Sequence, residues 1–292
     1  MYFPSDVRGK LQFIPAIPAA PANREAHERH NMNPLSFVAA VEAAFAMCII
    51  VMGGIVEGFG YGLSLGTNWP YTRSMPSLFR KGDPEVWHRI FATCLGLGSL
   101  GILVYHPGTL EITGFVLVVL TALLGAITLY TLSGRAPSIV PGIHDVLAYL
   151  TMIVYLLVAT GYDGGLTSYL LGVIPFHSFF LVILLGGMTT GQRGFQKPID
   201  YFVIPRTKAQ IVWVAHTLAV LLFVLTLAYY VRVFTVALLL VLIQMCVGMM
   251  TYQSVNKTPA RPGILVMIHQ MVAISIALSI FFSWYVALPL LG

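Results

Sequence analysis

Four histidines lie inside long apolar stretches of the chain, and side chains of this type at this spacing could take part in chemistry. They are His88, His144, His216 and His269. A polar side chain in such surroundings is costly unless it has a partner or a task. Two imidazoles from facing helices can bind both axial positions of one haem iron. We therefore predict two haem-binding pairs, His88 with His144 and His216 with His269. Zinc fits this pattern less well because it needs a third and a fourth tight ligand.

A carboxylate accompanies only one of the two predicted pairs. Glu85 lies three residues before His88 and so shares its helix face, and Arg89 follows at once. The residue three before His216 is Trp213. This difference predicts chemistry in the first half and a permanently bound cofactor in the second. The alternative for Glu85 is a structural one, since an anion in the first turn favours the helix dipole.

The composition excludes several classes of protein. Of the 292 residues, 58% are hydrophobic and 9% are charged, whereas a soluble domain has about 25% charged residues. A soluble enzyme and a disordered protein are excluded. The net charge of +5 comes from basic residues scattered between apolar runs, so no nucleic-acid partner is expected. The composition therefore predicts a protein that is embedded in membrane lipids.

Eight apolar stretches are long enough for a helix to cross a bilayer, which takes about 20 residues. They are roughly residues 35–56, 87–106, 109–132, 143–162, 166–189, 210–231, 233–252 and 263–290. Their length favours helices over barrel strands, which alternate over about ten residues. We expect an all-α integral membrane protein of eight transmembrane helices, preceded by a polar tail, residues 1–34.

The two halves of the chain resemble each other. Gly53 and Gly186 each begin a Gly-Gly pair near the end of a span, 133 residues apart, and the corresponding histidines are 128 and 125 residues apart. This pattern predicts two tandem four-helix bundles related by a pseudo-two-fold, residues 35–164 and 165–292, with both copies in the same orientation. Chance similarity between glycine-rich apolar runs is the alternative.

The four histidines also share one depth in the membrane. Each lies a few residues after the start of an even-numbered span, and these spans all start on one side. Asp83-Pro84 has the residues of a helix start before His88, and Thr207 with Gln210 has the spacing of a capping box before His216. A single intramembrane histidine is usually hydrogen-bonded to a neighbouring helix, but four at matching depth favour ligands.

Basic residues gather on the histidine side, which has eleven of the sixteen Lys and Arg. Haem propionates need such partners, and arginine binds carboxylates in a bidentate manner. The candidates for propionate binding are Arg73, Arg89, Arg135, Arg193 and Arg206. The positive-inside rule would put this side in the cytoplasm, although propionate binding gives the same bias a second cause.

The assembled pattern resembles the haem A synthase family of cytochrome oxidase assembly, which has eight transmembrane helices in two similar halves. The resemblance covers residues 35–285. The first-loop signature of that family is similar to Gly60-Tyr61-Gly62-Leu63-Ser64 followed by Trp69-Pro70. Its motif at the start of the second helix is similar to Glu85-Val86-Trp87-His88-Arg89.

This resemblance implies that the half with His88 and His144 binds haem O as substrate and that His216 and His269 bind the iron of haem b. The reaction would oxidise a haem methyl group to a formyl group through hydroxylation. Glu85 would handle protons or stabilise a positively charged intermediate. The family orientation would place the histidine side outside, against the charge count. Implied partners are a haem O-producing farnesyltransferase, an electron donor and a second copy of the chain.

The acidic residues of the tail, Asp6, Glu25 and Glu28, do not fit an organelle presequence. We therefore expect a prokaryotic plasma membrane.

Two positions depart from the family pattern. Many bacterial members have a cysteine pair in the first loop, whereas Leu65-Gly66-Thr67-Asn68 has none, which excludes a thiol-based redox step. Glu57 stands after the first Gly-Gly pair, where members commonly have arginine or another residue. It is a second candidate catalytic carboxylate that could support or compete with Glu85.

Two other functions share some of these features. A two-haem membrane electron carrier would use the same four histidines without needing Glu85. A transporter would also have parallel repeats, but the histidines lie near one surface and intramembrane acids are few, with Glu42 the main one.

Overall fold

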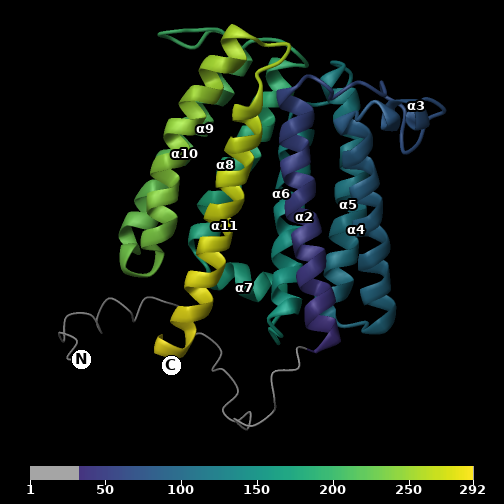
Figure 1. The fold of residues 1–292 in the computed structure, drawn as a ribbon. Helices are drawn as coiled ribbons and strands as arrows, with labels where there is room; N and C mark the ends of the chain where they lie inside the picture. The colour runs from purple at the N-terminus through teal and green to yellow at the C-terminus, as the bar shows by residue number, and fades with distance from the viewer. Residues whose placement is uncertain (1–32, 292) are drawn as a thin grey trace.

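A computed structural model of the chain describes residues 33–291, with side chains as far as Tyr285. Most of the predicted polar tail, residues 1–34, lies outside the described residues. The described part is helical throughout, without a strand (Figure 1). Its helices are α2 (Pro34–Gly58), α3 (Met75–Arg80), α4 (Pro84–Tyr105), α5 (Thr109–Leu132), α6 (Ile139–Ala159), α7 (Leu166–Gly172), α8 (Pro175–Arg193), α9 (Lys208–Tyr229), α10 (Val231–Lys257) and α11 (Ile264–Leu291).

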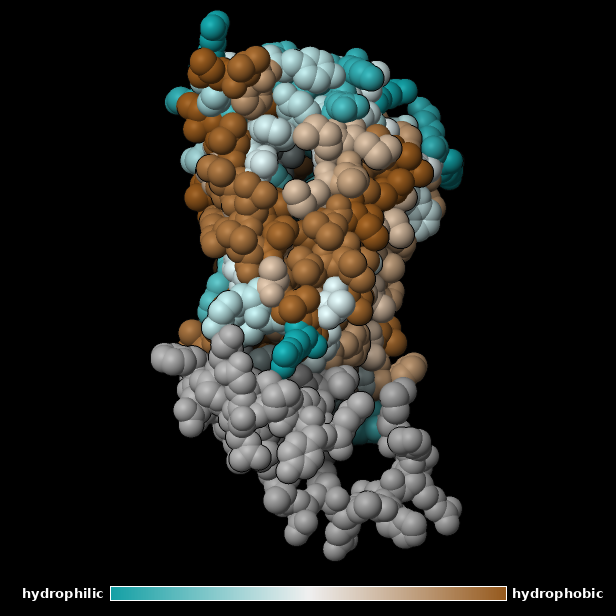
Figure 2. All heavy atoms as spheres, turned by 90° about the vertical axis from the view of Figure 1, so that its left-hand side faces the viewer, coloured by the Kyte–Doolittle hydropathy of each residue, from teal (hydrophilic) through white to brown (hydrophobic). Residues whose placement is uncertain are grey.

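The helices are those of a multi-pass membrane protein, as predicted. Among the described residues, seven helices are long and apolar enough to cross a membrane, or eight if α7 and α8 form one broken span. Figure 2 shows the corresponding surface, a broad hydrophobic belt below a hydrophilic end.

The predicted continuous span at residues 166–189 is wrong. The chain forms the short helix α7, leaves helical geometry at Val173 (φ −104°, ψ 76°) and starts again as α8, at an angle of 103°. Pro175 is the first residue of α8. Because proline has no N–H, it cannot continue the hydrogen-bond ladder of α7, but it fits the first turn of a new helix.

The starts of α4 and α9 confirm the predicted capping. The Asp83 side chain accepts the backbone N–H groups of Glu85 and Val86, and Thr207 with Gln210 forms a complete capping box. The helices α4, α6, α9 and α11 all start on the same side of the molecule (Figure 1). The four histidines therefore lie on this side, about 6 to 12 Å along each helix at 1.5 Å per residue.

Close backbone contacts join α2 to α11 and α6 to α8. The helix α2 packs against α6 and α11, and α6 also packs against α8. A Cβ atom at Gly54 would lie 3.0 Å from the Met267 Cα of α11, and one at Gly187 would lie 2.6 Å from the Gly142 Cα of α6. Glycine is needed at these two positions because a larger residue would push the helices apart. The outer neighbours, α4 with α5 and α9 with α10, touch far less.

Candidate histidine sites

Each of the four histidine rings packs against a glycine on the preceding membrane helix. A Cβ atom added to the glycine would lie 3.8 Å from the ring Cε1 for Gly53 and His88, 3.2 Å for Gly125 and His144, 3.3 Å for Gly186 and His216, and 3.3 Å for Gly248 and His269. Ordinary contacts of a Cβ atom begin at 3.4 Å. In three of the four cases the ring therefore fills the space that a side chain would need.

A backbone carbonyl four residues before the glycine faces the ring in three of these contacts. The Nδ1 atom of His144 lies 2.9 Å from the Thr121 oxygen, and that of His216 lies 3.0 Å from the Val182 oxygen. The His88 ring faces the Ile49 oxygen in the same way, but its Nδ1 has no hydrogen-bond partner of normal geometry among the described residues. Every Cα–Cβ bond in a helix tilts toward the N-terminus. A side chain four residues on would therefore cover this carbonyl, whereas glycine leaves it open to a second hydrogen bond.

The fourth ring has a different neighbour at this position. Gln244 lies four residues before Gly248, and its side-chain amide donates to the backbone oxygen of His269 at 2.8 Å. Among the described residues, Gln244 Oε1 and His269 Nδ1 are both buried without a hydrogen-bond partner. The contact between a histidine ring and a glycine thus recurs at His269 and Gly248, with the side-chain amide of Gln244 beside it.

Within each predicted pair, one ring lies in electrostatic range of the other. His88 and His144 lie close enough for a charge on one ring to act on the other, and the same holds for His216 and His269. An imidazole whose Nδ1–H is bound to a carbonyl has its lone pair at Nε2. No Nε2 atom of the four has a hydrogen-bond partner within residues 33–285. His144 and His216 therefore each have an Nε2 lone pair available for a ligand.

A metal ion bound by the protein alone would need a cluster of three or more ligand side chains. In the part of the chain that the structure describes, no three His, Cys, Asp or Glu side chains are placed together to hold a metal ion. A haem iron takes at most two axial ligands from the protein, so a cluster of three such residues is not a requirement for that group.

The Glu85 side chain is directed at the first loop. Its Oε2 accepts the Ser64 hydroxyl at 2.9 Å and the Leu65 backbone N–H at 3.1 Å, and its Oε1 forms an ion pair with Arg89 at 2.5 Å. The carboxylate is buried. These bonds make Glu85 a tie between the loop and α4, and they do not include His88.

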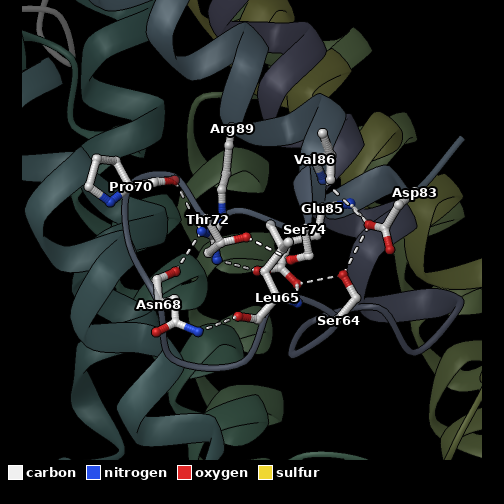
Figure 3. Close-up of polar contacts among 10 residues, drawn as sticks. All are labelled: Ser64, Leu65, Asn68, Pro70, Thr72, Ser74, Asp83, Glu85, Val86 and Arg89. Atoms are coloured by element: carbon white, nitrogen blue, oxygen red, sulfur yellow. Dashed lines mark hydrogen bonds and ion pairs between the residues drawn. The ribbon is translucent and has the colours of Figure 1, made fainter. Parts of the chain in front are cut away.

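Arg89 holds the same loop from the other direction. Its guanidinium donates to the Asn68 carbonyl at 2.6 Å and to the Pro70 carbonyl at 3.2 Å, in addition to Glu85. Figure 3 shows this network joining the loop to the start of α4. Because Arg89 is buried and bonds to three acceptors, its guanidinium fixes the loop backbone against α4.

Glu57 and Arg193 form an ion pair that joins the end of α2 to the end of α8. Arg193 also donates to the Lys197 carbonyl at 2.5 Å. The predicted second carboxylate is thus a bridge between α2 and α8. The other predicted propionate partners, Arg73, Arg135 and Arg206, lie exposed in loops on the histidine side.

Asp145 is a residue at this site that the sequence reasoning missed. It follows His144 on α6, and its Oδ2 atom lies 2.5 Å from where a Cβ of Gly187 would be. It is also within electrostatic range of Glu57. Since Gly187 follows the glycine that contacts His216, Asp145 lies between the neighbourhoods of the two pairs. The available signal was an acidic residue next to a predicted ligand inside an apolar span.

No protein-family model matches this chain, and no curated protein sequence matches it. What can be said of its class therefore comes from the fold and the site, which are those of a multi-pass helical membrane protein with four half-buried histidines on its membrane helices.

Proposed function

We propose that the protein binds two haems between its membrane helices, one through His88 and His144 and one through His216 and His269. The repeated packing of each ring against a glycine is the observation that carries this proposal. The residues fit the group, because the Nδ1 atoms of His144 and His216 are held by carbonyls, which leaves an Nε2 lone pair on each of these rings for the iron. Such an outer bond orients a ligating imidazole and raises its basicity. Bound haem supplies one-electron redox chemistry.

We further propose that the bundle is a duplicated four-helix unit of eight spans, residues 35–164 and 165–292, with α7 and α8 together as one broken span. The glycine contacts support this proposal. Gly54 and Gly187 are 133 residues apart, and their backbone partners Gly142 and Met267 are 125 residues apart. These offsets equal those of Gly53 to Gly186 and of His144 to His269, so corresponding residues make corresponding contacts.

The reaction we propose is that of a haem A synthase, the oxidation of a methyl group of haem O to a formyl group in a prokaryotic plasma membrane. The asymmetry between the halves supports it. The loop before α4 is fixed by the buried Glu85–Arg89 ion pair, whereas the loop before α9 is fixed by the amide side chains of Asn256 and Gln210. Haem O would bind at the first pair as the substrate, and haem b would stay on the second pair. A haem O-producing farnesyltransferase and an electron donor would be the partners.

The chain's own residues have defined tasks in this proposal. Arg89 and Glu85 hold the first loop at the start of α4, the helix that carries His88. Glu57, bound to Arg193, holds the ends of α2 and α8 together. Asp145 provides a carboxyl group between the two pairs.

A two-haem electron carrier is the second candidate, and one observation favours it. Both oxygens of the Glu85 carboxylate are already used by Ser64, Leu65 and Arg89. A carboxylate with these bonds has a complete structural role and need not take part in a reaction.

The spectrum and the extracted haems of the purified protein, after co-expression with a supply of haem O, test both candidates. Haem b together with haem O, its hydroxylated form or haem A would support the synthase. Haem b alone would favour the carrier, and a protein without haem would refute both.

Histidine variants assign the two pairs. His216→Ala should lose haem b and keep the haem of the first half, whereas His88→Ala should do the reverse. His177→Ala is the matched control, because His177 is a membrane-helix histidine of α8 that belongs to neither pair. Full haem content in His216→Ala would show that the pairing is wrong.

A further inference from the structure

A second group of polar side chains lies inside the first four spans, near the side opposite the histidine pairs. Glu42 of α2, Ser99 of α4, Glu111 of α5 and Tyr155 of α6 are all buried. Each of the four helices therefore contributes one polar residue. Counted from the helix ends on that side, these residues lie within about 12 Å of it. Buried groups of this kind are costly inside a membrane and usually have a task.

Tyr155 is at the centre of this group. Its ring fills the space beside Gly114 of α5, with the phenol oxygen 3.0 Å from where a Cβ would be. Ser99, Glu42 and Glu111 all lie close enough to act on the Tyr155 hydroxyl. Yet within the described residues this hydroxyl is buried without a hydrogen-bond partner of normal geometry.

Glu42 is the innermost member of the group. Its carboxylate lies in the space that Gly98 leaves on α4, and Oε2 is buried without a partner among residues 33–285. No cation pairs with it in the same part of the chain. An unpaired carboxylate is too costly in this environment, so the carboxyl group must hold a proton or be reached by water.

The outer end of the group reaches the surface at the turn between α4 and α5. His106 caps the end of α4, and its Nδ1 lies 2.9 Å from Glu111 Oε1. The His106 side chain is 57% exposed and that of Glu111 only 7%. This pair therefore connects water at the surface to a buried carboxyl group.

The last four spans have apolar residues at the corresponding positions. At the offsets of 128 and 125, Ser99 corresponds to Leu227 and Tyr155 to Ile280, both fully buried. At the offset of 133, Glu42 corresponds to Pro175. Packing of the fold thus does not need polar residues at these positions, and the first half alone contains them.

We propose that His106, Glu111, Tyr155 and Glu42 form a proton relay, which lets Glu42 exchange protons with water on the side opposite the histidine pairs. A proton taken up by His106 leaves Nδ1 for Glu111. Tyr155 then accepts that proton from Glu111 while its own hydroxyl hydrogen passes to Glu42, so each intermediate group regains its charge. Water molecules can complete this chain. The relay would supply or remove protons for chemistry in the first half. This purpose rests on the proposed function, whereas the relay itself does not.

Infrared spectroscopy of the full-length protein in phosphatidylcholine bilayers tests the relay. A protonated Glu42 has a carboxyl C=O band that moves when the buffer is changed from H2O to D2O, and Glu42→Gln identifies this band by its loss. Tyr155→Phe keeps the ring but removes the hydroxyl. It should slow the shift of the band by about a hundredfold, the lower end of what a positioned proton donor contributes. Glu111→Gln should slow the shift similarly.

Ser178→Ala is the matched control, since Ser178 is a buried hydroxyl at the same end of α8 and bonds only to its own helix at 3.2 Å. Its rate of exchange should equal that of the wild type. The haem spectrum of every sample separates this test from the haem proposal. The relay is refuted if Glu42→Gln removes no band, or if Tyr155→Phe and Glu111→Gln exchange as fast as the wild type, whatever the haem content.

Discussion

Replacing Gly186 with alanine should weaken haem binding in the second half without touching a ligand. The new Cβ would lie 3.3 Å from the His216 Cε1, which is closer than an ordinary contact, so the ring must move by a few tenths of an ångström. The same movement lengthens the bond of 3.0 Å from His216 Nδ1 to the Val182 carbonyl. In the haem-free protein the His216 ring is free to move aside. In the haem-bound protein the same ring would be an axial ligand of the iron and could not move aside.

The cost of this clash therefore falls on the haem-bound state. Overpacking of a well-packed site costs about 1–3 kcal/mol. At 1.4 kcal/mol for each factor of ten, this cost corresponds to a Kd for haem that is about 5-fold to 150-fold higher. Alanine has a better helix propensity than glycine, but this gain is the same with and without haem. It therefore does not offset the loss of haem affinity.

Gly53→Ala is the matched control, because it is the first glycine of the other Gly-Gly pair and its Cβ would lie 3.8 Å from His88 Cε1. Haem affinity should stay within about twofold of the wild type, which is less than 0.5 kcal/mol. Titration of the haem-free proteins with haemin, followed by the absorbance of the bound haem, measures both variants. Equal weakening in both, or unchanged affinity in Gly186→Ala, would refute the reasoning from ring packing.

Three further substitutions test other contacts of the bundle. Arg193→Met should lower the free energy of unfolding by about 3 kcal/mol, because it leaves the Glu57 carboxylate partly buried and unpaired. Thermal unfolding in detergent measures this loss, and adding Glu57→Gln should recover part of it; no recovery would mean that the ion pair is not the cause. Gly187→Ala should cost about 3 kcal/mol or more, since its Cβ would lie 2.6 Å from the Gly142 Cα, and a normal melting temperature would contradict this backbone contact. Glu85→Gln removes a buried ion pair, so amide hydrogen exchange in the first loop should become faster, whereas unchanged exchange would show that Glu85 does not hold the loop.

Most membrane helices could be predicted because length and hydropathy are direct properties of the sequence. The bend before Pro175 could not, since residues 166–189 are apolar on both sides of it and hydropathy has no direction. A proline within the stretch was the only signal, and proline is tolerated inside some membrane helices when neighbouring groups satisfy the freed carbonyls.

The histidine pairs were predictable from residue type, but their surroundings were not. The carbonyls of Thr121 and Val182 have no signature in the sequence, because every residue has a carbonyl and only the geometry of two helices selects one. Glu85 shows a similar limit. Residues three and four apart both share a helix face, so spacing alone does not decide between His88 and Arg89 as its partner.

The glycine contacts between the halves also determine how a bulky hydrophobic molecule can reach the interior. Gly54 against Met267 and Gly187 against Gly142 press the central helices together on the histidine side, so the halves cannot spread there to admit a ligand. The outer neighbours α4 with α5 and α9 with α10 touch less than α2 with α6 or α6 with α8, and their exposed faces are apolar. Exchange of a lipid-soluble ligand should therefore run sideways through these outer walls, from the bilayer itself.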